Sequence, residues 1–245
     1  MKDPIALIDG ARTPIGKFGG AYRNVPAHEL GPAAVKSALE RSGVNAYDVD
    51  EVIMGCIGQV GDDAYNARRV AISAGLPEKT PAYTVNRLCG SGLQAVWSAA
   101  QQIAFGGTDV VVAGGDENIT RMPFLDYAAR DGYRLGDRTL IDGTLAILND
   151  PFAQLPIGNA AEAVAQRYKV DRLAQDELAA ESQRRAATAE AKIVFAAEIT
   201  PVSVAGRRPT IIVIDEHPRP KTTLESLAGL RPAFAPGRAS SSICP

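Results

Sequence analysis

The stretch TPAYTVNRLCGSGLQAVWSAAQQIAFGGTDVVVAGGDE, residues 80–117, places a cysteine between a strand-like segment and the start of a helical pattern. Residues 82–86 (AYTVN) are β-prone, and residues 93–107 (LQAVWSAAQQIAFGG) carry apolar side chains at helical spacing. Residues 109–115 (DVVVAGG) form a short apolar run that ends in two glycines. This order predicts a βαβ unit with parallel strands, in which Cys89 lies on the turn before the helix.

The same alternation extends toward the N-terminus. Residues 25–43 and 64–76 have helical apolar spacing that stops at or beside a glycine, whereas residues 5–8 (IALI) and 51–58 (EVIMGCIG) are strand-like. Strands that alternate with helices favour an α/β fold with a mainly parallel sheet covered by helices. We therefore expect an α/β core over residues 1–117.

The pattern changes after residue 117, where loops and amphipathic helices replace the regular alternation. Residues 160–192 predict a helical pair, with Asp171 as a candidate cap of the second helix. These features, together with the strand-like segments that follow, predict an inserted α+β loop domain over residues 118–230.

Two strand-like segments close this predicted loop domain. They are residues 195–204 (FAAEITPVSV) and 210–215 (TIIVID), and residues 216–230 then predict a loop that leads into a short helix. Residues 231–245 contain no acidic residue and no periodicity, so we expect an irregular tail.

The composition is that of an ordinary globular protein. The 245 residues are 46% hydrophobic and 22% charged, which is sufficient for a sizeable buried core. Lys and Arg total 26 against 28 for Asp and Glu, a net charge of −2. This charge supplies no field for binding nucleic acid or an anionic membrane, so we expect neither as a partner.

The cysteines and histidines exclude two kinds of site. Cys56, Cys89 and Cys244 are odd in number and widely spaced, and only His28 and His217 could add imidazole ligands. Neither a disulfide framework nor a zinc site fits this set, so we expect no metal.

The N-terminal residues MKDPIALIDGARTPIGKF contain no apolar signal core, and no run of about 18 apolar residues occurs in the chain. These features, with the unpaired cysteines, indicate a reducing, soluble compartment. We expect a cytoplasmic protein.

Cys89 is the candidate nucleophile. A thiol at the N-terminus of a helix lies at the positive end of the helix dipole and near unpaired backbone N–H groups, and both favour the thiolate. Gly90 and Gly92 let other atoms approach the sulfur, and the N–H groups there can face a developing oxyanion. The alternative is a small buried core cysteine, since free cysteines are among the most buried residues. Spacing alone leaves both interpretations open.

Residues 85–96 (VNRLCGSGLQAV) resemble the nucleophile motif of thiolases, the family of acetyl-CoA acetyltransferases and 3-ketoacyl-CoA thiolases. The resemblance covers residues 5 to about 234 in family order. In the core it includes residues 9–20 (DGARTPIGKFGG), 51–77 (EVIMGCIGQVGDDAYNARRVAISAGLP) and 109–123 (DVVVAGGDENITRMP). In the family's inserted CoA-binding loop domain it includes residues 158–168 (GNAAEAVAQRY), 195–202 (FAAEITPV) and 215–234 (DEHPRPKTTLESLAGLRPAF).

The resemblance implies an acyl-CoA C-acyltransferase that uses Cys89. In this family the motif cysteine takes an acyl group from acyl-CoA and passes it to a second acetyl-CoA, or CoA cleaves a 3-ketoacyl-CoA in the reverse direction. The acyl-thioester intermediate keeps the acyl group activated while the first CoA leaves. The resemblance implies no metal and no cofactor beyond coenzyme A thioesters as substrates, and a role in fatty acid metabolism.

Two positions match family contacts to CoA. Arg219 matches a residue that reaches toward the nucleotide end of CoA, and Leu148 matches one that packs on its adenine and pantetheine side. The alternatives are a solvated loop cation for Arg219 and loop-domain core for Leu148. The family also pairs its sheets across a two-fold axis, which implies a homo-oligomer.

The chain departs from the family pattern at several places. Residues 156–158 read Pro-Ile-Gly where the family often has His-Met before the glycine of the acyl pocket, which leaves the acyl-length preference open. The family's Gly-His-Pro histidine, Asn-Glu-Ala-Phe motif and second cysteine have no counterpart here. His217 precedes a proline but follows Glu216, and Cys244 is one residue from the end, so neither matches. We therefore expect a truncated thiolase with impaired turnover.

Two other functions stay open. One is a catalytically silent half-protein that binds CoA or dimerises, which the absent motifs favour. The other is a decarboxylating condensing enzyme of the ketosynthase group, which the NRLCGSG motif of residues 86–92 and the CoA loop domain disfavour.

Overall fold

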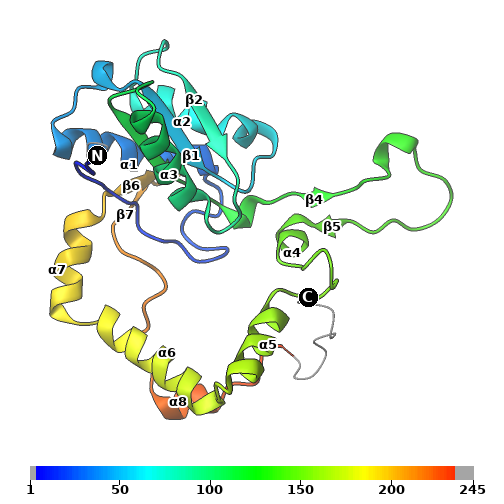
Figure 1. Cartoon of the computed structure of the whole chain (residues 1–245). Helices are drawn as coiled ribbons and strands as arrows, with labels where there is room; N and C mark the ends of the chain where they lie inside the picture. The colour runs from blue at the N-terminus through cyan, green and yellow to red at the C-terminus, as the bar shows by residue number, and fades with distance from the viewer. Residues whose placement is uncertain (1–3, 235–245) are drawn as a thin grey trace. The chain divides into compact units, whose positions relative to one another are not determined.

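The computed structural model describes residues 4–234, which divide into two compact units (Figure 1). The first unit comprises the residues up to Met122 together with Phe195–His217. The second comprises Pro123–Val194 and the described residues from Pro218 onward. The segment 195–217 lies within the range expected for the loop domain but makes its contacts inside the first unit.

A three-stranded parallel sheet forms the centre of the first unit. Its strands are β1 (Glu51–Gly55), β2 (Ala82–Val85) and β3 (Val111–Gly115), in the order β2-β1-β3. Both pairings are parallel, with Ile53 of β1 opposite Tyr83 on one side and Ala113 on the other. The α/β fold predicted from residues 80–117 is confirmed.

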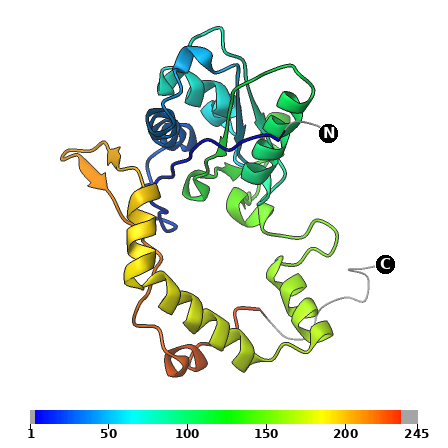
Figure 2. The ribbon, with the colours of Figure 1, turned by 60° about the vertical axis from the view of Figure 1, so that its left-hand side comes forward.

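Helices cover both faces of this sheet, because β1 buries side chains on both sides. Val52 and Met54 pack with residues of α1 (Ala27–Ser42) and α2 (Asn66–Ala74) on one face. Ile53 packs against the opposite face, where α3 (Ser91–Ala104) contributes buried alanines. Figure 2 shows α1 and α3 on opposite sides of the sheet.

Helix α3 buries only one of its faces. Ala95 and Ala99 are buried against the sheet, whereas Leu93 is 77% exposed and Trp97 is 63% exposed on the outer side of the helix. Phe105, the C-cap residue after Ala104, is also exposed. Within the described residues, Leu93 and Trp97 therefore form an exposed apolar surface on α3.

The strand predicted for residues 5–8 is wrong. These residues belong to no helix or strand, and Leu7 is 85% exposed. Apolar residues form a strand only where a neighbouring strand completes their hydrogen bonds. In the described part of the chain, the nearest bridge to this segment is at Arg12, which pairs with Ile199.

A short antiparallel pair completes the first unit. It consists of β6 (Val202–Val204) and β7 (Thr210–Ile212), and Val202 is buried with Leu30 of α1. The strand predicted for residues 195–204 is therefore correct only at its end. Residues 195–198 instead finish α7 (Ala189–Glu198), because a short apolar run is ambiguous between helix and strand.

The second unit is built mainly of helices, and the predicted helical pair is confirmed. Asp171 caps α6 by accepting a hydrogen bond from the N–H of Ala174 at 2.9 Å. The unit also contains the antiparallel pair β4–β5 and the short helix expected within residues 216–230. Its regular elements are β4 (Phe124–Leu125), β5 (Ile141–Asp142), α4 (Gly143–Ile147), α5 (Gly158–Tyr168), α6 (Arg172–Ala186) and α8 (Leu224–Ala228).

The connections within residues 4–234 contain four short 3-10 helices: η1 (Ala46–Asp48), η2 (Gly61–Tyr65), η3 (Ile119–Arg121) and η4 (Ala129–Asp131). Among residues 4–234, no helix has the length and apolar character needed to cross a membrane. Most of the expected tail, including Cys244, lies outside the described residues.

Candidate active site

Cys89 lies on a tight turn between β2 and α3. The turn is closed by backbone bonds from Gly90 N to Arg87 O at 3.1 Å and from Ser91 N to Leu88 O at 3.0 Å. The Asn86 side chain adds a third bond by accepting from Leu88 N at 3.0 Å. Leu88 has a φ of 49°, a left-handed conformation that is uncommon for a residue with a branched side chain. The chain thus reverses sharply at the residue before the cysteine.

The turn presents the cysteine to solvent. Cys89 is a free, exposed cysteine, so the core-cysteine interpretation is wrong for this residue. The residue stands two positions before the first residue of a 14-residue helix, whose N-terminus carries partial positive charge. A thiolate and a developing oxyanion are both stabilised in such a place.

Two strand-end glycines, Gly55 and Gly115, let the start of α3 lie directly on the ends of β1 and β3. A Cβ atom on Gly115 would lie 3.2 Å from Gly92 Cα and 3.0 Å from Gly55 O. A Cβ atom on Gly55 would overlap the backbone of Ser91. Gly55 ends β1 and Gly115 ends β3, so the cysteine turn lies at the carboxyl ends of the parallel strands. Open α/β sheets bind their ligands at this edge.

A polar cluster that the sequence analysis missed lies beside the same strand ends. The Glu117 carboxylate accepts hydrogen bonds from Ile57 N at 2.7 Å and Gly58 N at 3.2 Å, which fixes the loop after β1. Asp116 accepts a bond from the Asn66 amide at 2.5 Å. The pKa of Asp116 is raised to about 7, first by burial and then by the nearby charges of Asp63 and Glu117, while the bond from Asn66 opposes the shift.

Among the described residues, neither histidine makes a hydrogen bond with Cys89. His28 is only 2% exposed, and its Nδ1 donates to the Asp63 carboxylate at 2.5 Å. His217 follows Asp215 and Glu216, whose carboxylates hold the N-terminal loop: Asp215 accepts from Ile15 N at 2.7 Å, and Glu216 from two further backbone N–H groups. The structure thus gives residues 215–217 (Asp-Glu-His) a role in fixing that loop.

The two candidate CoA contacts lie in the second unit, whereas Cys89 lies in the first. Leu148 is exposed and ends α4, where its carbonyl accepts a bond from Ile157 N at 2.8 Å. Arg219 is exposed in the loop before α8, and its backbone N–H donates to the Gln183 side chain at 2.6 Å. Both residues therefore present their side chains outside the core of their unit.

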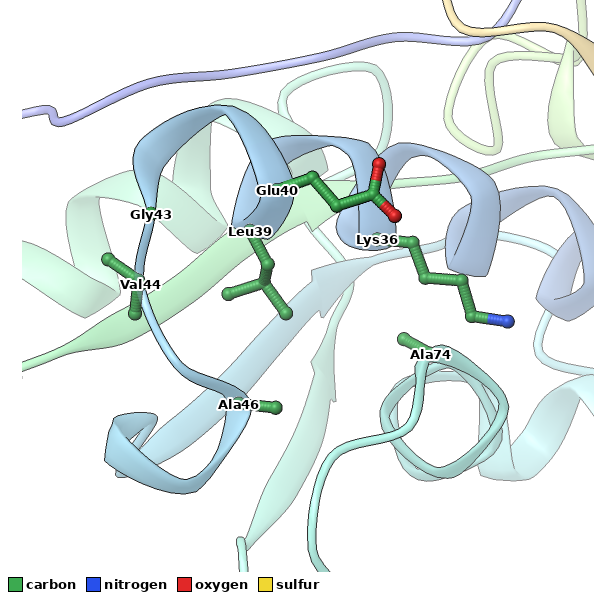
Figure 3. A pocket seen from close by; sticks show the side chains of 7 residues that line it. All are labelled: Lys36, Leu39, Glu40, Gly43, Val44, Ala46 and Ala74. Atoms are coloured by element: carbon green, nitrogen blue, oxygen red, sulfur yellow. The ribbon is translucent and has the colours of Figure 1, made fainter.

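The first unit has a hollow beside the amino end of β1, opposite to the strand ends that carry the cysteine turn. It has a volume of about 360 Å³ and is lined by the ends of α1 and α2 and the loop between α1 and β1 (Figure 3). Lys36 and Glu40 are its charged residues, and Leu39, Val44 and Ala74 supply apolar surface. This loop leads into the start of β1, so the hollow is separate from the cysteine turn at the strand ends.

Comparisons with known proteins decide the family. A family model described as the N-terminal domain of thiolase matches residues 5–241, nearly the whole chain. The chain belongs to the thiolase family.

Its relatives include an acetyl-CoA acetyltransferase of Cupriavidus necator, which is 44% identical over 233 residues, and a probable acetyl-CoA acyltransferase of Staphylococcus epidermidis, which is 42% identical over 233 residues. Each alignment covers 94% of this thiolase chain and 59% of the relative. The chain therefore spans about three fifths of the length of these curated relatives.

Solved thiolase structures share the fold. The crystal structure of the Bacillus anthracis acetyl-CoA acetyltransferase superposes with a TM-score of 0.89 at 40% identity, and covers 93% of this chain and 58% of its own. Human mitochondrial 3-ketoacyl-CoA thiolase in complex with CoA gives a TM-score of 0.87 at 37% identity, with 93% and 57% coverage. The thiolase-like fold expected from the sequence is confirmed.

Proposed function

We propose that this chain carries the nucleophilic half-reaction of an acyl-CoA C-acyltransferase, with Cys89 as the catalytic residue. The observation that carries the proposal is the exposed Cys89 at the N-terminus of α3, on a turn in a chain that belongs to the thiolase family. The relatives named as acetyl-CoA acetyltransferase and 3-ketoacyl-CoA thiolase support this class of reaction.

The first step is acyl transfer to sulfur. The Cys89 thiolate forms a bond with the thioester carbonyl carbon, and the tetrahedral oxyanion develops at the positive end of the α3 dipole. The bond to the CoA sulfur then breaks, and CoA leaves as a thiolate that takes up a proton. The acyl group stays on Cys89 as a thioester, ready for a second acetyl-CoA in condensation or for CoA in thiolysis.

The substrate is a coenzyme A thioester. Arg219 supplies a positive charge for the nucleotide end of CoA, and Leu148 supplies apolar surface for its adenine and pantetheine portion. Their exposure in the second unit supports these roles. The reaction needs no metal, since the thiolate is the nucleophile and the helix N-terminus stabilises the oxyanion.

The family resemblance is also the basis for the oligomeric state, location and metabolic role that we propose. We expect a homo-oligomer, a cytoplasmic location and a role in fatty acid metabolism, as the family resemblance implies. Light scattering checks the first of these, and a sharply monomeric species would contradict it.

Intact-mass spectrometry tests the proposed step directly. After incubation with acetyl-CoA, the parent chain should gain one acetyl group, and Cys89→Ala should gain none. The buried Cys56 supplies a matched control, because Cys56→Ala should be acetylated like the parent chain. A chain that stays unmodified would favour the catalytically silent CoA-binding or dimerising protein. Acetylation that persists in Cys89→Ala would place the nucleophile elsewhere.

A further inference from the structure

One buried hydroxyl group, that of Ser91, makes two hydrogen bonds to the backbone of the turn that carries Cys89. Ser91, the first residue of α3, is 4% exposed. Its Oγ accepts a hydrogen bond from the backbone N–H of Arg87 at 2.9 Å and donates one to the carbonyl of Leu88 at 2.6 Å. The hydroxyl therefore bridges Arg87 and Leu88, the two residues that precede the cysteine.

These bonds serve the turn and not the helix. A serine that stabilises a helix start normally accepts a bond from an N–H in the first turn of that helix. In α3 the N-cap is Gly90, which makes no side-chain capping bond, and both bonds of the Ser91 hydroxyl go backward along the chain. Removing the hydroxyl would leave the Arg87 N–H without this partner and would weaken the contact that holds Leu88.

The conformation of the turn needs such support. Leu88 is held at a positive φ, and a residue in this region persists only where its surroundings determine its backbone. The Ser91 backbone packs directly against Gly55 of β1, so it has no room to shift toward the sheet. The hydroxyl thus connects the strained Leu88 to the Ser91 backbone, which its packing against Gly55 holds in place.

We propose that Ser91 is a positioning residue for Cys89: its hydroxyl group locks the Arg87–Leu88 backbone and thereby holds the thiol at the N-terminus of α3. This inference rests on the proposed function, because positioning matters for a nucleophile. A thioester carbonyl must meet the sulfur along a defined direction, and a displacement of about 1 Å can lower a rate roughly 100-fold.

Three variants test the proposal: Ser91→Ala removes the hydroxyl, Ser91→Thr keeps it, and Ser98→Ala is the matched control. Ser98 lies on the same helix, and its hydroxyl accepts a bond from the Gln94 side chain at 3.0 Å. Three readouts are compared: the rate of Cys89 alkylation by iodoacetamide, the rate of acetylation by acetyl-CoA, and amide hydrogen exchange in peptides that cover residues 86–91.

Positioning predicts a defined pattern. In Ser91→Ala, exchange at residues 86–91 accelerates while the rest of α3 keeps its protection, Cys89 alkylation slows about 3- to 10-fold, and acetylation slows at least about tenfold, since acyl transfer needs the stricter geometry. Ser91→Thr restores all three readouts, and Ser98→Ala leaves them unchanged.

Other outcomes overturn the inference. Parent-like alkylation and exchange in Ser91→Ala would show that the hydroxyl does not hold the turn. An equal loss in Ser98→Ala would assign the effect to general weakening of α3. If Ser91→Ala does not fold, hydrogen exchange in the parent chain tests the proposal. An Arg87 amide that exchanges without protection would contradict it. A parent chain that acetyl-CoA does not modify would refute the proposed function alone, since alkylation and exchange still test Ser91.

Discussion

At the scale of single residues, the chain places two cysteines in opposite environments. Cys56 is buried after β1, where desolvation and then the charge of Glu117 raise the pKa of its thiol far above the ordinary value. Cys89 is exposed at a helix N-terminus. The thiolate is the reactive form of cysteine, so these environments separate the two in reactivity.

Iodoacetamide should therefore modify Cys89 at least about tenfold faster than Cys56 at neutral pH, because thiolate character and access both favour Cys89. The measurement is peptide mass spectrometry over a time course, which also separates the label on Cys244. Cys56 in urea-unfolded protein is the control for intrinsic reactivity. Equal rates in the folded chain would remove the argument from exposure and the helix dipole.

Asp116 should make the stability of the fold depend on pH. Its pKa is raised from 3.8 to about 7, first by burial, so the folded state favours the protonated carboxyl group. This contribution is fully present below about pH 4 and is lost as the pH rises through about 7, and it amounts to at most about 4 kcal/mol. Urea unfolding of the parent and of Asp116→Asn at each pH measures it. The stability difference between the two should change in favour of the variant as the pH rises from 4 to 8, and a constant difference would contradict the assigned pKa.

At the scale of secondary structure elements, the contact between α3 and the strand ends depends on the absence of side chains. Gly55, Gly92 and Gly115 come from three different elements and meet at one point. The contact places the cysteine turn against the sheet, so packing and the proposed chemistry share the same residues.

Substituting Gly55 or Gly115 should destabilise the first unit. Gly115→Ala forces backbone shifts at Gly92 and Gly55 and should cost about 1–3 kcal/mol, as overpacking typically does. Gly55→Ala should cost more, because its Cβ would overlap the Ser91 backbone. Gly107→Ala is the control, since its Cβ would lie 3.9 Å from the nearest atoms. Thermal unfolding measures all three, and a neutral Gly55→Ala would show that α3 sits farther from β1.

The sequence predicted those elements whose signal lies in neighbouring residues, and it failed where distant residues decide the structure. The βαβ unit, the helical pair and the Asp171 cap carry local signals in residue spacing, and the structure contains each of them. Residues 5–8 have an equally strong local signal, but a strand also requires a neighbouring strand, which no local pattern reports. The Asp116–Asn66 pair was missed for the related reason that its residues lie 50 positions apart.

At the scale of the whole molecule, the proposed nucleophile lacks a partner of its own among the described histidines. His28 is buried against Asp63, and His217 belongs to the segment that fixes the N-terminal loop. A thiolase cycle needs a base to deprotonate the thiol and a group to take the α-proton of acetyl-CoA, and each contributes roughly 10²–10⁴-fold.

The chain of 245 residues should therefore acetylate on Cys89 yet turn over acetoacetyl-CoA far more slowly than its acetyl-CoA acetyltransferase relatives. Thiolysis followed by CoA consumption measures the rate, with Cys89→Ala as the background. Robust turnover that depends on Cys89 would mean that another group acts as the base, and His217→Ala would then identify or exclude the first candidate.

The exposed apolar face of α3 has a spectroscopic consequence. Trp97 is the only tryptophan of the chain, and its indole ring lies largely in solvent, two helical turns from Cys89. Its fluorescence emission therefore reports on one surface alone, without a background from other indole groups. Any protein segment or second copy that covers α3 will transfer this ring from water to an apolar environment and shift its emission to shorter wavelength. The molecule thus contains its own optical probe for the surface next to its nucleophile.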